Sequence, residues 1–335
     1  MSSAGIRAGC ENTGGLVFGD DYARFIEVSE LAQTPDQKGK RHRNAVEQRN
    51  RMNERYEAIF ADNQDILDGA RVLDLASHDG RFSFAALKAG AAHVTGVEVR
   101  QSLVDKAHET FAYYNQDPET YRFVCGDVFT VLDQERFDVD VVLCLGYMYH
   151  TYRHTELMYR LHNLAPGHLI VDTMVARGKQ PTLRLICERD TEDIRSAAKD
   201  PYSVGRVPVL WPSVPALEML LRAYGFDAES MYDWKSRLAN RPAVTGLDGY
   251  ANGTRVTMRC RFDESVITSA WKPAAKPAAS PQVAAAAASQ PAPASQPAPA
   301  SQPAPAQPAG GWRERVNRVL AKTTGYELRR ASTKP

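Results

Sequence analysis

The sequence predicts an α/β fold with a mostly parallel β-sheet, and three observations carry that prediction. Strand-like and helix-like segments alternate between residues 44 and 265. The strand-like runs are continuous stretches of Val, Ile and Leu, which is typical of parallel strands covered on both faces. The last two strand candidates are joined by a stretch without a clear helical pattern, which indicates an antiparallel hairpin at the end of the sheet.

The first helix of the domain is expected over residues 44–60. Asn44, with Glu47 three residues later, is typical of a capped start. One face of this helix is apolar and predicts packing against the sheet: Met52, Tyr56, Ile59 and Phe60. The other face carries three arginines, which we interpret as a solvated polar face in preference to a ligand site: Arg49, Arg51 and Arg55.

Seven segments then follow as strand candidates: 71–76, 92–99, 123–127, 139–146, 168–175, 226–234 and 254–262. Helical patterns separate several of them: 82–90, 101–115, 154–164 and 214–225, the last with Ser213 as its expected cap. Residues 177–211 form an insertion that mixes charged, aromatic and proline residues, and we expect it to be a lid or substrate wall. With the loop 235–253 it is expected to decide specificity.

Composition excludes several classes of protein. The 335 residues hold 41 Lys and Arg against 40 Asp and Glu, so bulk charge favours neither nucleic acid nor membrane as a partner. The 5 cysteines are scattered without a CxxC pair, which argues against a disulfide scaffold and a cysteine zinc site. The beginning of the chain lacks a signal-peptide pattern, and no apolar run is long enough to cross a membrane. A cytoplasmic location is therefore expected.

We expect four parts along the chain: an N-terminal extension (1–43), the α/β domain (44–265), a disordered linker (266–311) and a tail (312–335). The linker consists mostly of Ala, Pro, Ser and Gln, which bury too little apolar surface to order a segment. From Gly311 onward, seven basic residues stand against two acidic ones, so this segment carries +5 within a total of +1. Its pattern indicates a basic amphipathic helix that could contact a membrane surface or a protein partner, or else a disordered polar tail.

Acidic side chains follow the first three strands at their carboxyl ends, where open parallel sheets bind ligands. The loop after the first strand runs from Asp74 to Gly80 and contains small residues that let a ligand approach the backbone. Glu98 ends the second strand, where a carboxylate can accept hydrogen bonds from both hydroxyls of a ribose. Asp127 ends the third strand and could receive an adenine amino group. Together these residues predict a nucleoside pocket.

In this order and spacing, the residues resemble those of class I S-adenosylmethionine-dependent methyltransferases, whose fold is a Rossmann-like seven-stranded sheet with a terminal antiparallel strand. The resemblance covers about residues 45–263 and includes the PG turn in LAPGHLIV. In the glycine-rich loop of that family, two of three expected glycines are Ala76 and His78 here, which argues against a nicotinamide dinucleotide. The resemblance implies S-adenosylmethionine as cofactor and the following residues as its binding site: Asp74, Ala76, His78, Gly80, Glu98, Asp127, Val128 and Leu145.

A narrower resemblance is to the wobble-uridine tRNA carboxymethyltransferase group. It rests on the segment LGYMYHTYRHTELMYRLHNLAPGHLIVDTMV and on WPSVPALEMLLRAYGF. The domain lacks an extended basic face, and phosphate contacts with tRNA would favour clustered Lys and Arg. Nucleic acid is therefore not the expected partner.

His150, which follows the fourth strand, is the residue that we expect to act as general base. The pKa of an unperturbed imidazole lies near neutrality, which suits proton removal from a hydroxyl. A histidine that braces the next helix is an equal alternative. One of Tyr147 and Tyr149 is expected to line the substrate pocket while the other packs in the core.

Three further residues near these strand ends have more than one interpretation. Asp172 could orient the base or bind a cation, although structural hydrogen bonding is favoured and no metal site is predicted. Asp79 is expected to face solvent or to cap a helix. Trp211 could stack on a substrate ring, with burial in the core as the favoured alternative.

The sequence thus predicts an enzyme that methylates oxygen on a small molecule or glycan. Two alternatives remain open: a tRNA-modifying transferase, and a non-catalytic cofactor-binding module tethered to a membrane or complex.

Overall fold

The computed structural model describes residues 18, 24–27, 45–189, 204–242 and 244–270. The chain divides into two compact units, Met1–Ala274 and Ala275–Pro335, and all described residues belong to the first. Residues 266–270 of the expected linker lie in helix α12 (Ser265–Ala270), and the rest of the linker, the basic tail and the cap at Asn44 lie outside the described residues.

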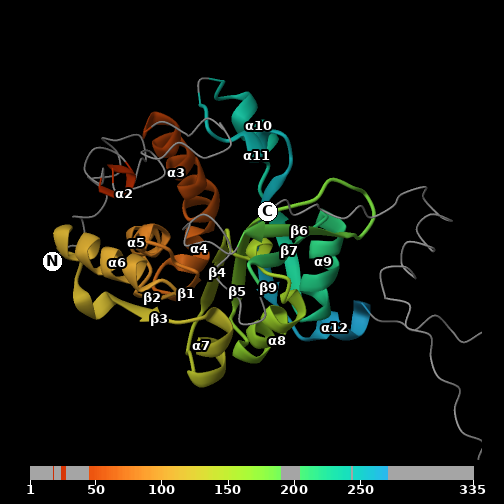
Figure 1. Ribbon diagram of the computed structural model, residues 1–335, viewed down its shortest axis with the longest axis horizontal. Helices are drawn as coiled ribbons and strands as arrows, with labels where there is room; N and C mark the ends of the chain where they lie inside the picture. Colours follow the sequence, from red (N-terminus) through yellow and green to blue (C-terminus); the bar gives the residue numbers. More distant parts are fainter. Residues whose placement is uncertain (1–17, 19–23, 28–44, 190–203, 243, 271–335) are drawn as a thin grey trace, which may run out of the picture. The chain divides into compact units, whose positions relative to one another are not determined.

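Seven strands form the main sheet, in the order β3-β2-β1-β4-β5-β9-β8 (Figure 1). Their bounds are β1 (Arg71–Leu75), β2 (His93–Glu98), β3 (Tyr121–Cys125), β4 (Val141–Leu145), β5 (His168–Met174), β8 (Phe226–Met231) and β9 (Arg255–Phe262). The pairs among β1 to β5 are parallel, and β9 runs antiparallel to both β5 and β8. The predicted fold class and the antiparallel hairpin are confirmed.

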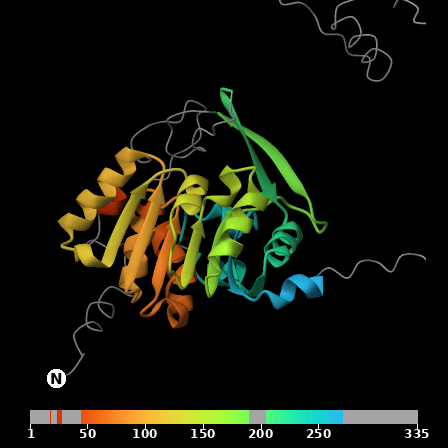
Figure 2. The same cartoon turned by 90° about the horizontal axis from the view of Figure 1, so that it is seen from below.

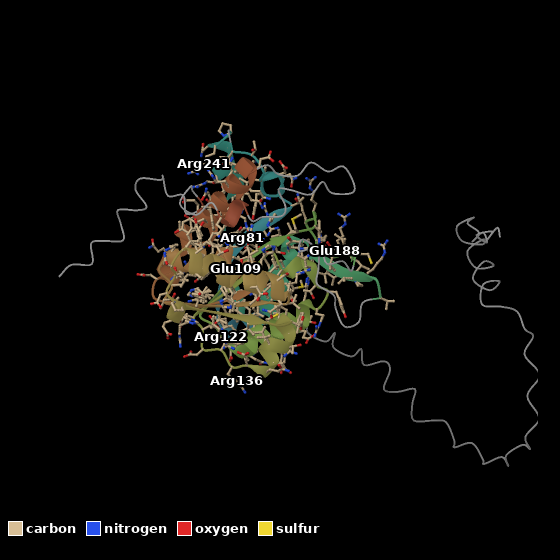
Figure 3. The ribbon with its side chains drawn as sticks, turned by 60° about the vertical axis from the view of Figure 1, so that its left-hand side comes forward. Arg81, Glu109, Arg122, Arg136, Glu188 and Arg241 are labelled. Carbon is tan, nitrogen blue, oxygen red and sulfur yellow. The ribbon has the colours of Figure 1, made fainter. Side chains whose placement is uncertain are left out.

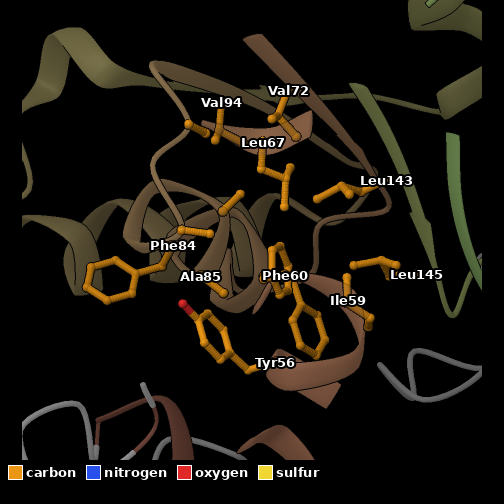
Figure 4. Packing of buried hydrophobic residues seen from close by; sticks show 14 of the residues in the cluster. Tyr56, Ile59, Phe60, Leu67, Val72, Phe84, Ala85, Val94, Leu143 and Leu145 are labelled. Atoms are coloured by element: carbon orange, nitrogen blue, oxygen red, sulfur yellow. The ribbon is translucent and has the colours of Figure 1, made fainter. Parts of the chain in front are cut away.

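Helices cover both faces of the sheet. Their bounds are α3 (Ala45–Ile59), α4 (Gln64–Leu67), α5 (Arg81–Lys88), α6 (Gln101–Tyr113), α7 (Val128–Gln134), α8 (His154–Leu164), α9 (Val214–Ala223) and α12 (Ser265–Ala270). Aromatic side chains from α3, α5 and α6 pack on one face, where Phe60 and Phe84 are fully buried (Figure 4). Aliphatic side chains from α7, α8 and α9 cover the other face. The sequence pattern did not indicate α7.

Two segments that were expected to be irregular contain regular structure. The insertion 177–211 holds β6 (Leu183–Arg189) and β7 (Arg206–Pro212), which pair antiparallel as a separate ribbon (Figure 2). The loop 235–253 holds part of α10 (Trp234–Ala239) and all of α11 (Asp248–Ala251). Asp233 caps α10 by accepting a hydrogen bond from the backbone N–H of Ser236 at 3.0 Å.

Helix α3 lies as predicted with its apolar residues in the core, but its opposite face is not uniformly solvated. Arg55 is buried at 7% exposure and packs over the ring of Phe82. Glu54 on the same helix pairs with Arg237 and Arg241, which ties α3 to α10 and its flank. The prediction of a solvated polar face is therefore wrong for Arg55, because tertiary contacts bury it.

The described residues of the N-terminal extension pack against the domain. Phe18 is fully buried, and its backbone N–H donates to Asn53 Oδ1 at 2.9 Å. Phe25, in α2 (Arg24–Glu27), stacks near Phe84 and Tyr114. These contacts add aromatic surface to the face that α3 covers.

Candidate active site at the carboxyl ends of the strands

The loop between β1 and α5 has the backbone of a glycine-rich loop although two of its residues are not glycine. Ala76, His78 and Gly80 all adopt left-handed φ values, of 54°, 56° and 75° respectively. Such values are uncommon for residues with a Cβ and persist where the surroundings impose them. Here the N–H of Ser77 donates to Val97 O on β2 at 2.9 Å, which holds the loop against the neighbouring strand.

Glu98, at the end of β2, is the carboxylate around which this loop is organised. Its side chain is buried, and its two oxygens accept hydrogen bonds from the backbone N–H groups of His78 at 3.1 Å and Arg100 at 3.0 Å. A carboxylate has about four acceptor positions, so two remain for further donors. The structure thus brings the second predicted acid to the loop that follows the first strand.

Asp74, in β1, lies at the same edge but in a drier environment. Its side chain is buried, and Ser83 Oγ donates to Asp74 Oδ2 at 2.7 Å. Burial raises the pKa of the Asp74 carboxyl to about 7, since desolvation outweighs the hydrogen bond from Ser83 and the charge of Arg55. This carboxyl can therefore change protonation near neutral pH.

The residues expected after β3 and β4 complete this edge. Asp127 is the N-cap of α7, and its Oδ1 accepts from the N–H of Thr130 at 3.1 Å. Val128 and Leu145 are buried apolar residues at the start of α7 and the end of β4. Asp79 is buried and pairs with Arg81, so the expectation that it faces solvent is wrong. Ion pairing with Arg81 holds the pKa of Asp79 low despite its burial, which by itself would raise it.

Asp172, two residues before the end of β5, is the centre of a buried polar network. Its Oδ1 accepts from Arg255 Nε at 2.6 Å and from Arg55 at 3.2 Å. Its Oδ2 accepts from the hydroxyls of Tyr250 and Thr257 at 2.8 Å and 2.7 Å. Burial would raise the pKa of Asp172, but the two guanidinium groups outweigh it and hold the pKa well below its usual range. Structural hydrogen bonding was the favoured interpretation, and the contacts confirm it.

Tyr149 extends this network toward the loop after β4. Arg255 Nη1 donates to the Tyr149 hydroxyl at 3.3 Å. Burial alone would raise the pKa of this phenol, but the charges of Arg255 and His150 bring it to about 7. Tyr147, by contrast, packs against the aliphatic face of the sheet beside Phe129. The structure therefore decides between the two tyrosines in favour of Tyr149 for the polar site.

His150 ends the short helical turn η5 (Met148–His150) after β4. Its Nδ1 lies 3.0 Å from Glu188 Oε2 on β6, and its ring lies 4.1 Å from that of Tyr149 between centroids. Burial would lower the pKa of His150, but the Tyr149 phenol and the Glu188 carboxylate outweigh it and raise the pKa. His154, the other histidine nearby, is buried and bonded through Nε2 to Met148 O at 2.8 Å, so it braces the loop.

Comparison with known proteins assigns the framework that holds these residues. Residues 72–165 match the family described as "Methyltransferase domain". The chain carries a class I S-adenosylmethionine-dependent methyltransferase domain. The matched segment begins in β1 and ends after α8, so it contains the loop after β1, Glu98, Asp127 and His150.

Curated relatives of the methyltransferase domain act on RNA, according to their names. The chain is 42% identical over 67 residues to the ribosomal RNA large subunit methyltransferase I of Pseudoalteromonas translucida, covering 20% of this chain and 17% of that protein. It is 28% identical over 163 residues to the tRNA U34 carboxymethyltransferase of Pseudomonas fluorescens, covering 48% and 46%. The similarity to the enzyme of that name from Desulforapulum autotrophicum is 24% over 176 residues, covering 52% and 50%. The chain thus spans half the length or less of these relatives.

A solved structure similar to this domain is the 1,6-didemethyltoxoflavin-N1-methyltransferase of Burkholderia thailandensis. It is 17% identical, has a TM-score of 0.46 and covers 72% of this chain and 88% of that one. In the ranges that the structure describes, no helix has the length and apolar character needed to cross a membrane.

The loop after β1 fits the S-adenosylmethionine that is typical of this family. Within the described part of the chain, the buried Ser77 Oγ has no hydrogen-bond partner. This oxygen lies against β2, because a Cβ added at Gly96 would come within 2.7 Å of it, so it marks the close packing of the loop on the sheet. The acceptor positions left on Glu98 suit the hydroxyls of a ribose. The donor and acceptor chemistry of this edge therefore agrees with a nucleoside cofactor.

Three functional candidates were missed or undervalued by sequence reasoning: Arg55, Arg255 and Glu188. Arg55 and Arg255 contact Asp172 across 117 and 83 residues, and Glu188 contacts His150 across 38. No local pattern announces such contacts. The sequence offered one indication, Asp172 in an apolar strand, because a buried carboxylate needs a charged or hydrogen-bonding partner.

Proposed function

We propose that this protein transfers the methyl group of S-adenosylmethionine to an oxygen atom of a small molecule or glycan, with His150 as the general base. The position of His150 carries the proposal. It lies just after β4, which pairs with β1, and Glu98 lies beside β1 on β2, so base and nucleoside pocket share one edge of the sheet. Asp74, Glu98 and Asp127 support the binding of the cofactor, and His150 supports the transfer of the methyl group to a hydroxyl.

The chemistry divides between the cofactor and the chain. When bound, S-adenosylmethionine supplies an electrophilic methyl group on a sulfonium. Glu98 and the loop after β1 hold the nucleoside, and Asp127 has a second carboxylate oxygen that can receive an amino group. His150 Nε2 takes the proton from the acceptor hydroxyl, which makes its oxygen a better nucleophile.

Titration calorimetry of the full chain with S-adenosylmethionine tests the cofactor half of the proposal. We expect binding, and a loss of about tenfold or more in affinity for Glu98→Gln, because an amide presents fewer acceptor positions. His150→Ala should bind the cofactor as wild type does. Absence of binding to the wild-type chain would contradict the proposal.

Product assays on candidate acceptors then test the base. Loss of a positioned general base costs about 10²–10⁴-fold in rate, so turnover of His150→Ala should fall by that factor with unchanged cofactor affinity. Unchanged turnover would remove His150 from the mechanism and leave the cofactor site standing.

Transfer of a carboxymethyl group to tRNA is a second candidate, favoured by the names of the relatives and by an excess of positive charge in the polar site. The buried guanidinium groups of Arg55 and Arg255 face the carboxylate of Asp172 and the Tyr149 phenol, whose pKa of about 7 leaves it only partly ionised at neutral pH. Excess positive charge in a dry site favours an anionic group such as a carboxylate. Salt-dependent binding of tRNA to the full chain would support this candidate, and equal affinity at low and high salt would oppose it.

A further inference from the structure

The ribbon formed by β6 and β7 belongs to an insertion, yet it is anchored next to the proposed base. Leu210 N–H on β7 donates to Thr151 O at 3.2 Å, one residue after His150. Trp211 lies edge-on to Tyr149, with ring centroids 6.3 Å apart. The ribbon therefore contacts the loop after β4 through both its backbone and its side chains.

The strand period places Glu188 on the side of the ribbon that faces this loop. Side chains in a strand alternate between its faces. Glu188 pairs with Val207, and Ile186 pairs with Val209. Both valines are buried, whereas Leu185 and Cys187, on the other side, are exposed. Glu188, labelled in Figure 3, thus approaches His150 from the buried face, and each side chain of the pair is less than one-fifth exposed.

We propose that Glu188 is a positioning residue: it holds Nδ1–H of His150 so that Nε2 carries the lone pair that accepts the substrate proton. The inference rests on the proposed function of His150 and deepens it. A carboxylate accepts hydrogen bonds and cannot donate them, so the 3.0 Å contact requires a proton on Nδ1. In the neutral imidazole Nε2 is then the acceptor, so the hydrogen bond to Glu188 fixes the tautomer of His150.

The proposal gives the inserted ribbon a function that a specificity wall alone would not have. A carboxylate that orients a histidine base and stabilises its protonated form is the arrangement found in hydrolytic triads. Here the orienting group comes from an insertion, so displacing the ribbon would alter the base as well as the substrate pocket.

Nuclear magnetic resonance of the histidine ring nitrogens in the full chain tests this without knowledge of the acceptor. The 8 histidines are labelled with ¹⁵N, and His150 is assigned from the signal missing in His150→Ala. In the neutral state of the wild type we expect the proton on Nδ1. Among the described residues, the charged and titratable groups that face His150 are Glu188 on β6, Tyr149 on η5 and Arg255 on β9. The titration of His150 is therefore recorded in the wild type and in each Glu188 variant.

Two variants separate orientation from charge. Glu188→Gln keeps an oxygen that accepts from Nδ1–H, so the tautomer should stay while the titration midpoint of His150 falls by about one unit. Glu188→Ala removes the acceptor, so the proton should shift largely to Nε2. Glu218→Gln, an exposed carboxylate on α9, is the matched control and should change neither. Circular dichroism and the urea midpoint confirm that each variant is folded.

The outcomes distinguish this inference from the proposed function. A neutral wild-type His150 with its proton on Nε2, or identical spectra for wild type and Glu188→Ala, would overturn the role of Glu188 whatever the enzyme does. Failure of S-adenosylmethionine to bind, or full turnover by His150→Ala, would instead overturn the proposed function and leave the tautomer result unaffected.

Discussion

The two halves of the sheet edge differ in the residues that hold their carboxylates. At β1, β2 and β3, the carboxylates are held by partners close in sequence: Glu98 accepts from the backbone N–H groups of His78 and Arg100 and lies 3.7 Å from the Arg100 guanidinium, and Asp79 pairs with Arg81. At β4, β5 and β9, one carboxylate, Asp172, is surrounded by guanidinium groups and hydroxyls from distant elements. The first half keeps acceptor capacity available, whereas the second consumes it within the protein.

This difference assigns different costs to the two halves. A carboxylate held by backbone amides belongs to its loop, so its removal disturbs one local segment. A buried ion pair joins several elements, and removing one partner leaves the other charged and desolvated. Substitutions at β4, β5 and β9 should therefore lower the free energy of unfolding more. Substitutions at β1, β2 and β3, the cofactor half, should lower the affinity for the cofactor more.

The largest expected effect is that of Asp172→Asn on stability. The substitution leaves the buried Arg55 and Arg255 without their anion, so the free energy of unfolding should fall by about 3–5 kcal/mol. Urea unfolding of the full chain measures it. The matched control is Glu135→Gln, which breaks a partly exposed pair with Arg122 and should cost less than about 1 kcal/mol. Equal losses in the two variants would contradict the contrast between buried and exposed pairs.

An intermediate effect is expected for the pH dependence conferred by Tyr149. Its pKa in the folded chain is about 7, against 10.0 when unperturbed, so between these values the unfolded chain binds the extra proton. The contribution of Tyr149 to the free energy of unfolding therefore rises by about 1 kcal/mol from pH 7 to pH 8, while the raised pKa values of Asp74 and His150 act in the opposite direction. Tyr149→Phe should lack this increment, as urea unfolding at the two pH values would reveal.

Absorbance of the phenolate provides the independent check on Tyr149. Wild type should gain a near-ultraviolet phenolate signal around neutral pH that Tyr149→Phe lacks. Tyr147→Phe is the control, because Tyr147 packs beside Phe129 in the aliphatic core, and its removal should leave that signal in place. Titration of the same signal only near pH 10 would refute the assignment.

The strands of the main sheet could be predicted because each has a recognisable run of apolar residues. The ribbon of β6 and β7 was not predicted. The run from Val141 to Leu145 is apolar at every position and is buried throughout. In β6, polar residues alternate with apolar ones that are exposed, as Leu185 is, so the segment lacks the pattern of a strand with a buried apolar face. Short α10 depends on its cap at Asp233 and on tertiary contacts more than on periodicity.

The candidate site shows the same division between local and distant information. Glu98 and His150 are predicted from their positions after strands, which topology brings to one edge. Their partners are of two kinds. His78, which donates to Glu98, lies in an adjacent loop and was itself a candidate. Glu188 and Arg255 are ordinary charged residues in the sequence, and only the folded chain reveals that Glu188 contacts His150 and that Arg255 is buried against Asp172.

The smallest expected effect concerns the loop after β1, where Ala76 has a φ of 54°. A Cβ in left-handed conformation costs roughly 1–2 kcal/mol, and glycine avoids this cost. Glycine also loses more entropy on folding, by about 0.4–1 kcal/mol relative to alanine. Ala76→Gly should therefore raise the free energy of unfolding by about 0.5 kcal/mol.

The matched control for that change is Ala112→Gly, at an exposed position of helix α6, where glycine should be destabilising by about 0.5–1 kcal/mol. The same chemical substitution thus has opposite signs at the two sites, and urea unfolding resolves the difference between them more precisely than either value alone. If both variants are destabilised equally, the left-handed backbone at Ala76 is not a source of strain. The alanine and histidine in this loop would then be compatible with its conformation at no cost, and the cofactor half would store no strain there.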